Sequence, residues 1–146
     1  MVSKKILVVD DEEAIREVMK MGLVKLGYDP VFAENGKEAF EILTREKFPL
    51  ILMDIRLPGM DGIEFLKKVK QRSPGTVGMI MSGFVKPEAV SNAMNRGVVN
   101  RFKEKPLDIN EIKQAVAIAN TRYKIDVECR RERMSLIQPR RVFSFQ

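Results

Sequence analysis

The strongest constraint on the fold is a regular alternation between short apolar runs and longer segments with helical periodicity. The runs are rich in β-branched and aliphatic residues, whereas apolar residues in the intervening segments recur at helical spacing. The runs predict strands at residues 5–10, 28–33, 50–54, 77–82 and 98–103. The other segments predict helices at residues 12–27, 35–47, 61–72, 86–97 and from 108 onward. This (βα)₅ pattern favours an α/β fold, a parallel sheet with helices on both faces.

Individual residues refine this arrangement. The run 50–54 is apolar up to its last residue, which predicts a central strand buried on both faces. Pro30 has no backbone N–H to donate, so the strand 28–33 is expected at an edge of the sheet. Asp61 stands where its side chain could cap the helix 61–72.

The composition limits the class of protein. A chain of 146 residues with 45% apolar residues is long enough for one ordinary core. No apolar run approaches the roughly 20 residues of a membrane span, and the N-terminus does not resemble a signal peptide. Cys129 is the single cysteine, which excludes an internal disulfide. We therefore expect a cytoplasmic protein.

The chain contains no histidine. This absence excludes Ser-His-Asp and Cys-His catalysis, histidine-ligated zinc and histidine acid–base chemistry.

The formal charge of +6 is unevenly distributed along the chain. Residues 1–121 hold 19 basic and 17 acidic residues, a net of +2, whereas residues 122–146 hold 7 and 3, a net of +4. The basic character therefore belongs mostly to the C-terminal segment.

Polar residues stand at the carboxyl ends of the predicted strands, the edge where open α/β sheets place their functional groups. These residues are Asp10 and Asp11, Asp54, Ser82 with Gly83, and Lys105 with Pro106. Three carboxylates close together would repel one another unless a cation lay among them. Oxygen ligands without histidine or cysteine favour a hard ion, with Mg²⁺ first. A lysine and a hydroxyl facing that ion would suit a phosphoryl group, which Asp54 could accept as a nucleophile.

The stretches LVVDDE, LILMDIRLPGMDG, MIMSG and FKEKP, in this order, resemble the receiver domain of two-component response regulators. The likeness extends over residues 4–122. Within the family, the chain is similar to the single-domain chemotaxis-type regulator. It implies a flavodoxin-like sheet with strand order 2-1-3-4-5. It divides the chain into a receiver domain, 1–122, and a basic extension, 123–146.

The resemblance also implies roles for individual residues. Asp54 would be the phosphoacceptor. Mg²⁺ would be held by Asp11 directly, by Asp10 through water, by Asp54 and by the backbone carbonyl of Arg56.

Two further groups would complete the site and its switch. Lys105 would contact the phosphoryl group. Ser82 would be the switch hydroxyl and Phe102 the aromatic residue that turns inward with it. Arg56 and Phe84 would face the mouth of the site and affect how fast the aspartyl-phosphate hydrolyses.

Simpler interpretations stand beside these roles. Asp54 could merely end its strand, and Asp10 and Asp11 could serve the start of the next helix. Lys86 precedes a proline as Lys105 does, but it opens a helix. Ser82 could be a plain strand-end hydroxyl, and Phe102 a plain core residue.

The function expected from the resemblance is a signalling switch that takes a phosphoryl group from a histidine kinase or phosphotransfer protein. A downstream protein would read a surface on the last helices, and a homodimer is a further option. One rival function is a Mg²⁺-dependent phosphatase or phosphotransferase, although such enzymes generally carry a second Asp where this chain has Arg56. Another is a receiver-like binding module that is never phosphorylated. The resemblance implies that the domain catalyses its own phosphotransfer and dephosphorylation but acts mainly as a signalling switch.

The segment 123–146 allows several interpretations. It could continue the last helix, dock on a partner, form a dimer contact or be a linker from a longer protein. Its basic cluster, Arg130, Arg131 and Arg133, is a weak indication of nucleic-acid binding, and we expect none from this chain alone.

Overall fold

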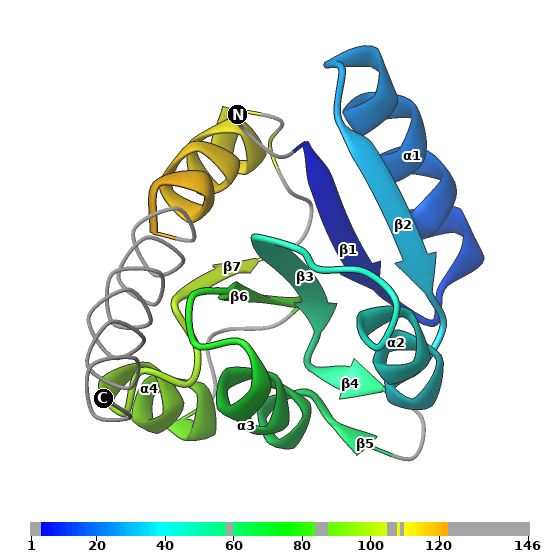
Figure 1. The fold of residues 1–146 in the computed structure, drawn as a ribbon. Coiled ribbons are helices and arrows are strands. Elements are labelled where there is room, and N and C mark those ends of the chain that lie inside the picture. Colours follow the sequence, from blue (N-terminus) through cyan, green and yellow to red (C-terminus); the bar gives the residue numbers. More distant parts are fainter. Residues whose placement is uncertain (1–3, 58–59, 84–87, 105–107, 109, 123–146) are drawn as a thin grey trace, which may run out of the picture.

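The computed structural model describes residues 4–57, 60–83, 88–104, 108 and 110–122. Its centre is a five-stranded sheet in the order β2-β1-β3-β6-β7, in which all neighbours are parallel (Figure 1). The bounds of its strands are β1 Lys5–Val9, β2 Asp29–Ala33, β3 Leu50–Asp54, β6 Val77–Ser82 and β7 Arg101–Glu104. This order confirms the flavodoxin-like topology predicted from the sequence.

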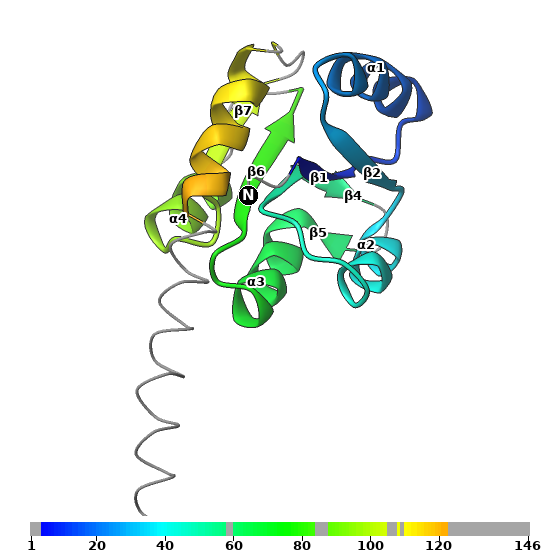
Figure 2. The same ribbon diagram turned by 45° about the horizontal axis from the view of Figure 1, so that its top comes forward.

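Helices connect the strands and cover both faces of the sheet (Figures 1 and 2). Their bounds are α1 Glu13–Lys25, α2 Gly36–Leu43, α3 Gly62–Arg72 and α4 Glu88–Asn95, followed by a last helix at 110–122. The helices α2, α3 and α4 pack on one face, and α1 and the last helix pack on the other.

The core follows the period of two residues of a β-strand. In β3, Ile51 and Met53 belong to the cluster under α2, α3 and α4, whereas Leu50 and Leu52 belong to the cluster under α1 and the last helix. All of β3 is buried, as expected for a central strand. Burial on both faces fixes the position of the residue that ends this strand.

Several details differ from the sequence-based expectation. Val18 is 69% exposed, so α1 buries a narrower stripe than its apolar residues suggest. The strand expected at 98–103 begins only at Arg101. A two-stranded antiparallel pair, β4 Arg56–Leu57 and β5 Met60–Asp61, lies between β3 and α3 and was not among the predicted strands. Pro30 does lie in an edge strand, and Asp61 is the N-cap of α3.

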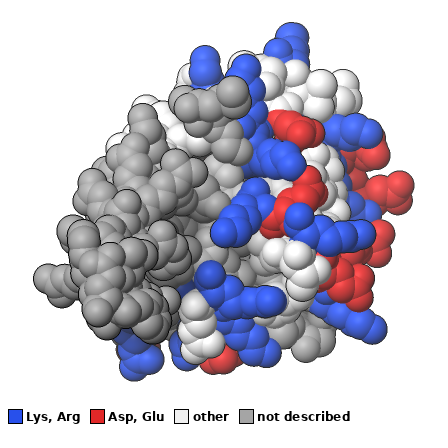
Figure 3. Space-filling view, viewed as in Figure 1, with Lys and Arg blue, Asp and Glu red and all other residues white. Residues whose placement is uncertain are grey.

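Charged side chains of both signs are interspersed over the described part of the face shown in Figure 3. This mixture agrees with the small net charge of residues 1–121. None of the helices in the described part of the chain is both long and apolar enough to span a bilayer.

Candidate phosphoacceptor and metal site

Asp54 is fixed by the sheet on both sides. It ends β3, which lies between β1 and β6, and it is opposite Met81 in the register of β6. The next residue, Ile55, donates its N–H to the Met81 carbonyl at 3.1 Å. Asp54 is only 7% exposed. A carboxylate held in this way has little freedom to move away from its neighbours.

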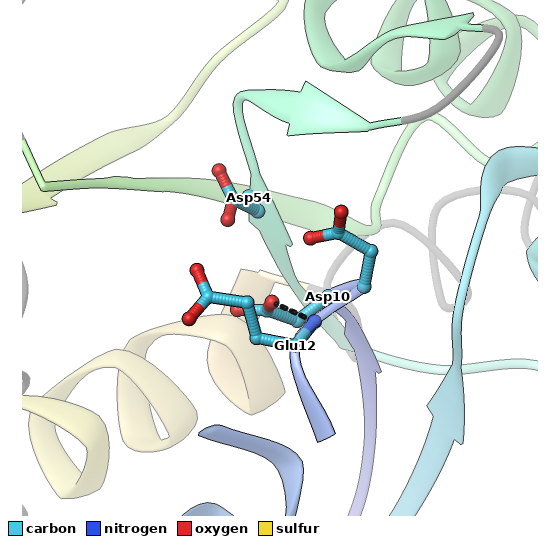
Figure 4. A group of neighbouring side chains, drawn as sticks. Asp10, Glu12 and Asp54 are labelled. Atoms are coloured by element: carbon cyan, nitrogen blue, oxygen red, sulfur yellow. Dashed lines mark hydrogen bonds between the residues drawn. The ribbon is translucent and has the colours of Figure 1, made fainter. Parts of the chain in front are cut away.

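Three other carboxylates lie beside it. Oxygen atoms of Asp10, Asp11, Glu12 and Asp54 all lie within 4.8 Å of one another. Asp10 is fully buried and Asp11 and Glu12 are exposed, so the cluster opens to solvent on one side. Figure 4 shows Asp10 and Glu12 reaching toward Asp54 from the segment that follows β1.

Hydrogen bonds fix the backbone around Asp10. Its N–H donates to the Ala33 carbonyl at 3.0 Å, which continues the pairing of β1 with β2. Its side-chain Oδ1 accepts the N–H of Glu12 at 2.9 Å, as the dashed line in Figure 4 marks. Arg16 Nη1 donates to the Asp10 carbonyl at 2.7 Å, and Arg16 also pairs with Glu34 at 3.4 Å. Arg16 is therefore a positioning residue for this end of β1.

Glu12 and Arg16 were not among the site residues predicted from the sequence. Glu12 directly follows two of the predicted carboxylates, so its place in the chain was a usable signal. Arg16 gave no such signal, because its role depends on a contact with a backbone carbonyl that a residue pattern does not reveal. The interpretation of Asp10 and Asp11 as helix-start residues is partly right. The N-cap of α1 is Glu12, and Asp10 accepts the N–H of that residue.

Ser82 and Phe102 lie on the strands next to Asp54. Ser82 ends β6 at the same edge of the sheet and is 2% exposed. Phe102 lies opposite Ile80 in β7 and is partly buried against the core cluster under α2, α3 and α4. Its position is compatible with a plain core role as well as with a switch role.

The chain that follows Asp54 approaches it closely again at the start of α3. Gly62 is buried, and a Cβ atom there would lie 3.1 Å from the Asp54 carbonyl oxygen. The backbone of Arg56 lies in β4, opposite Asp61. Lys105, Phe84 and the rival Lys86 lie outside the described residues.

The donor set suits a hard cation. It consists of carboxylates alone, two of them buried, and carboxylate oxygens are the ligands that Mg²⁺ prefers. Without a cation, these like charges repel one another at short range. The residues present therefore fit Mg²⁺ chemically.

Comparison with known proteins agrees with this geometry. The sequence profile of the response regulator receiver domain matches residues 6–117. Sporulation initiation phosphotransferase F of Bacillus subtilis is 38% identical over 116 residues, which are 80% of this chain and 93% of that protein. The response regulator protein PilR of Pseudomonas aeruginosa is 35% identical over 80% of this chain, but the match spans only 26% of PilR.

A solved structure supports the same conclusion. The beryllofluoride-activated NtrC4 receiver domain dimer superposes with a TM-score of 0.74 at 31% identity. The match covers 82% of this chain and 98% of that domain. The fold, the sequence and the acidic sheet edge of the present chain together show that it belongs to the family of response regulator receiver domains.

Proposed function

We propose that this receiver domain is a phosphorylation switch in which Asp54 accepts a phosphoryl group from a phosphohistidine. The observation that carries the proposal is the position of the Asp54 carboxylate, which lies with three others at the end of a central, buried strand. A chain that needed only to end a strand would gain nothing from placing four like charges there.

The reaction is a transfer between two nucleophiles. An Asp54 carboxylate oxygen attacks phosphorus, the P–N bond to the donor imidazole breaks, and the imidazole leaves. The product is an aspartyl-phosphate, which water later hydrolyses. The phosphotransferase named among the relatives supports a role in phosphoryl relay.

The surrounding residues would prepare the site for an incoming phosphoryl group. Asp10, Asp11 and Asp54, with the Arg56 carbonyl, would hold Mg²⁺, and the structure adds Glu12 as a fourth carboxylate nearby. Bound Mg²⁺ would offset the charge of the carboxylates and of the phosphoryl oxygens. Lys105 and Ser82 are proposed to contact those oxygens.

The output would follow from the added charge. Phosphoryl oxygens would attract the Ser82 hydroxyl, and Phe102 on the neighbouring strand would turn inward. β7 is connected to the last helix by the ion pair between Lys103 and Glu111, 3.2 Å long. A change in β7 could thus reach a surface that a downstream protein reads.

Partners and setting follow from the same function. The donor would be a histidine kinase or a phosphotransfer protein in the cytoplasm. The solved NtrC4 receiver is a dimer, which supports a homodimer as one way of transmitting the signal. The segment 123–146, which is proposed to serve as a docking tail or linker, lies outside the described residues.

The test is transfer from a phosphorylated histidine-containing donor to the purified chain. We expect labelling of the wild type that requires Mg²⁺, and its loss in Asp54→Asn. Asp61→Asn is the matched control, because Asp61 is an exposed carboxylate close by that caps α3 and can be replaced by another capping residue. Equal labelling of Asp54→Asn and the wild type would refute the proposal. The absence of any labelling would favour a receiver-like binding module.

A further inference from the structure

Asp11 is an exposed member of the acid cluster and lies in a bend between β1 and α1. In the described part of the chain, its side chain takes part in no hydrogen bond or ion pair. Its carboxylate nevertheless points into the cluster with Asp10 and Asp54. The direction of the Asp11 side chain therefore depends on the two peptide units that flank it.

Hydrogen bonds hold both of these peptide units. The carbonyl of Asp10, in the unit before Asp11, accepts a hydrogen bond from Arg16 Nη1 at 2.7 Å. The N–H of Glu12, in the unit after Asp11, donates to Oδ1 of Asp10 at 2.9 Å. Because each peptide unit is planar, fixing both of them leaves the backbone of Asp11 little freedom to rotate. Arg16 thus restrains one of the two units that direct the Asp11 carboxylate.

The Arg16 side chain is itself held in place. It is only 16% exposed, and Nη2 pairs with Oε1 of Glu34 at 3.4 Å. Glu34 follows β2 and its side chain is 65% exposed, so this ion pair contributes little stability by itself. The pair does orient the planar guanidinium, whose other nitrogen then faces the Asp10 carbonyl.

The charge of Arg16 acts against its geometric effect. A positive charge beside the acid cluster repels any cation that binds there, so removing the charge alone would strengthen cation binding. Removing the hydrogen bond to Asp10 would free the peptide before Asp11 and weaken cation binding. The two effects have opposite signs, which makes them separable by experiment.

We propose that Arg16 is a positioning residue that raises the affinity of the acid cluster for a divalent cation in spite of its own positive charge. It does so by holding the peptide between Asp10 and Asp11, which aims the Asp11 carboxylate at Asp54. The inference rests on the proposed function, because it takes the cluster as the cation site. Loss of a hydrogen bond that orients a metal ligand typically weakens metal binding about tenfold or more.

The test is the affinity of the full chain for Mn²⁺, which suits carboxylate ligands and whose free ion is measured by electron paramagnetic resonance. We expect the dissociation constant to rise about tenfold in Arg16→Met. Arg16→Lys should show a smaller loss, because it keeps the charge and one donor nitrogen. Lys20→Met is the matched control: Lys20 is an exposed cation one turn further along α1, without a hydrogen bond or ion pair in the described part of the chain. This control should bind Mn²⁺ at least as tightly as the wild type.

Circular dichroism and thermal unfolding separate positioning from stability, because a purely structural role would lower the melting temperature without changing the affinity of the folded protein. If Arg16→Met does not fold, Arg16→Gln replaces it with the same expectation, since glutamine is too short to reach the Asp10 carbonyl. A folded variant that binds Mn²⁺ as tightly as the wild type, or more tightly, would overturn the inference. Asp11→Asn tests the proposed function separately. If Asp11→Asn bound Mn²⁺ as tightly as the wild type, the cluster would not be the cation site, and the inference would fail with it.

Discussion

Carboxylate oxygens of Asp10 and Asp54 lie within 4.8 Å of each other at the ends of two neighbouring parallel strands. The register explains this proximity, because Val9 pairs with Met53 and each of these residues is followed by one of the two aspartates. Both residues are nearly or fully buried, at 0% and 7% exposure. The fold therefore holds two like charges together before any ligand is bound.

Removing one of these charges should stabilise the protein when no divalent ion is present. For Asp54→Asn we expect the free energy of unfolding in a chelator to rise by about 1 kcal/mol, the repulsion of two unit charges about 4 Å apart in bulk water. Urea denaturation measures this difference. A variant less stable than the wild type would show that the Asp54 carboxylate stabilises the fold more through its other interactions than it destabilises it through repulsion.

Mg²⁺ should stabilise the wild type by binding to the folded state. At ten times the dissociation constant, the expected gain is about 1.4 kcal/mol. Asp11→Asn should lose most of this gain, because it removes a carboxylate from the cluster. Glu13→Gln should keep it, because Glu13 lies in the first turn of α1 but outside the cluster. Thermal unfolding with and without MgCl₂ compares the three proteins, and an equal gain in all of them would argue against a site at the cluster.

The cap of α3 should contribute measurably to stability. Asp61 Oδ1 accepts the N–H of Ile63 at 2.8 Å, and Asp61→Ala leaves this N–H without that partner. We expect a loss of about 1 kcal/mol in urea denaturation, the usual effect of removing an N-cap. Asp61→Asn should stay within a few tenths of a kcal/mol of the wild type, since asparagine caps equally well. If both variants lost the same amount, the charge of Asp61 and not its cap would be responsible.

Lys70 should make stability depend on pH in the alkaline range. Burial and the nearby charge of Arg122 lower its pKa in the folded state from 10.5 to about 8, so between these values the unfolded chain binds more protons. Stability therefore rises as the pH increases through this range. The contribution is up to about 2 kcal/mol, at 1.36 kcal/mol per pKa unit with a discount for partial exposure.

The comparison of the wild type with Lys70→Met isolates this contribution, because other titrating groups cancel in the difference. The advantage of the wild type over the variant should grow between pH 7.5 and pH 10. A difference that stays constant over this range would mean that Lys70 titrates normally in the folded protein.

The sequence predicted the features of this structure that depend on burial and chain order. The apolar run Leu50–Met53 indicated a central strand, and Pro30 indicated an edge strand. The strand-end carboxylates Asp10, Asp11 and Asp54 were expected to converge, and the structure brings them together. These predictions succeed because burial on both faces marks a central strand and because the carboxyl ends of parallel strands meet at one edge of the sheet. Few other placements of these strands and carboxylates are compatible with the sequence.

Other features depend on contacts that a residue pattern does not specify. Val18 fits the helical stripe of α1 but is exposed, because its side of the helix does not face the sheet. The β4–β5 pair consists of very short strands, which have no periodicity to detect. Arg16 positions the end of β1 by donating a hydrogen bond to the carbonyl oxygen of Asp10. Each of these depends on the final packing of the elements.

The most direct test of the central claim is to locate the phosphoryl group by mass spectrometry after reaction with a phosphohistidine donor and Mg²⁺. Borohydride reduction of the acyl phosphate would mark the modified aspartate within the peptide that spans residues 49–62. We predict that the label lies on Asp54 and is absent when the metal is chelated. A label on Ser82 or on another carboxylate, or one that forms equally well without Mg²⁺, would contradict the proposed site.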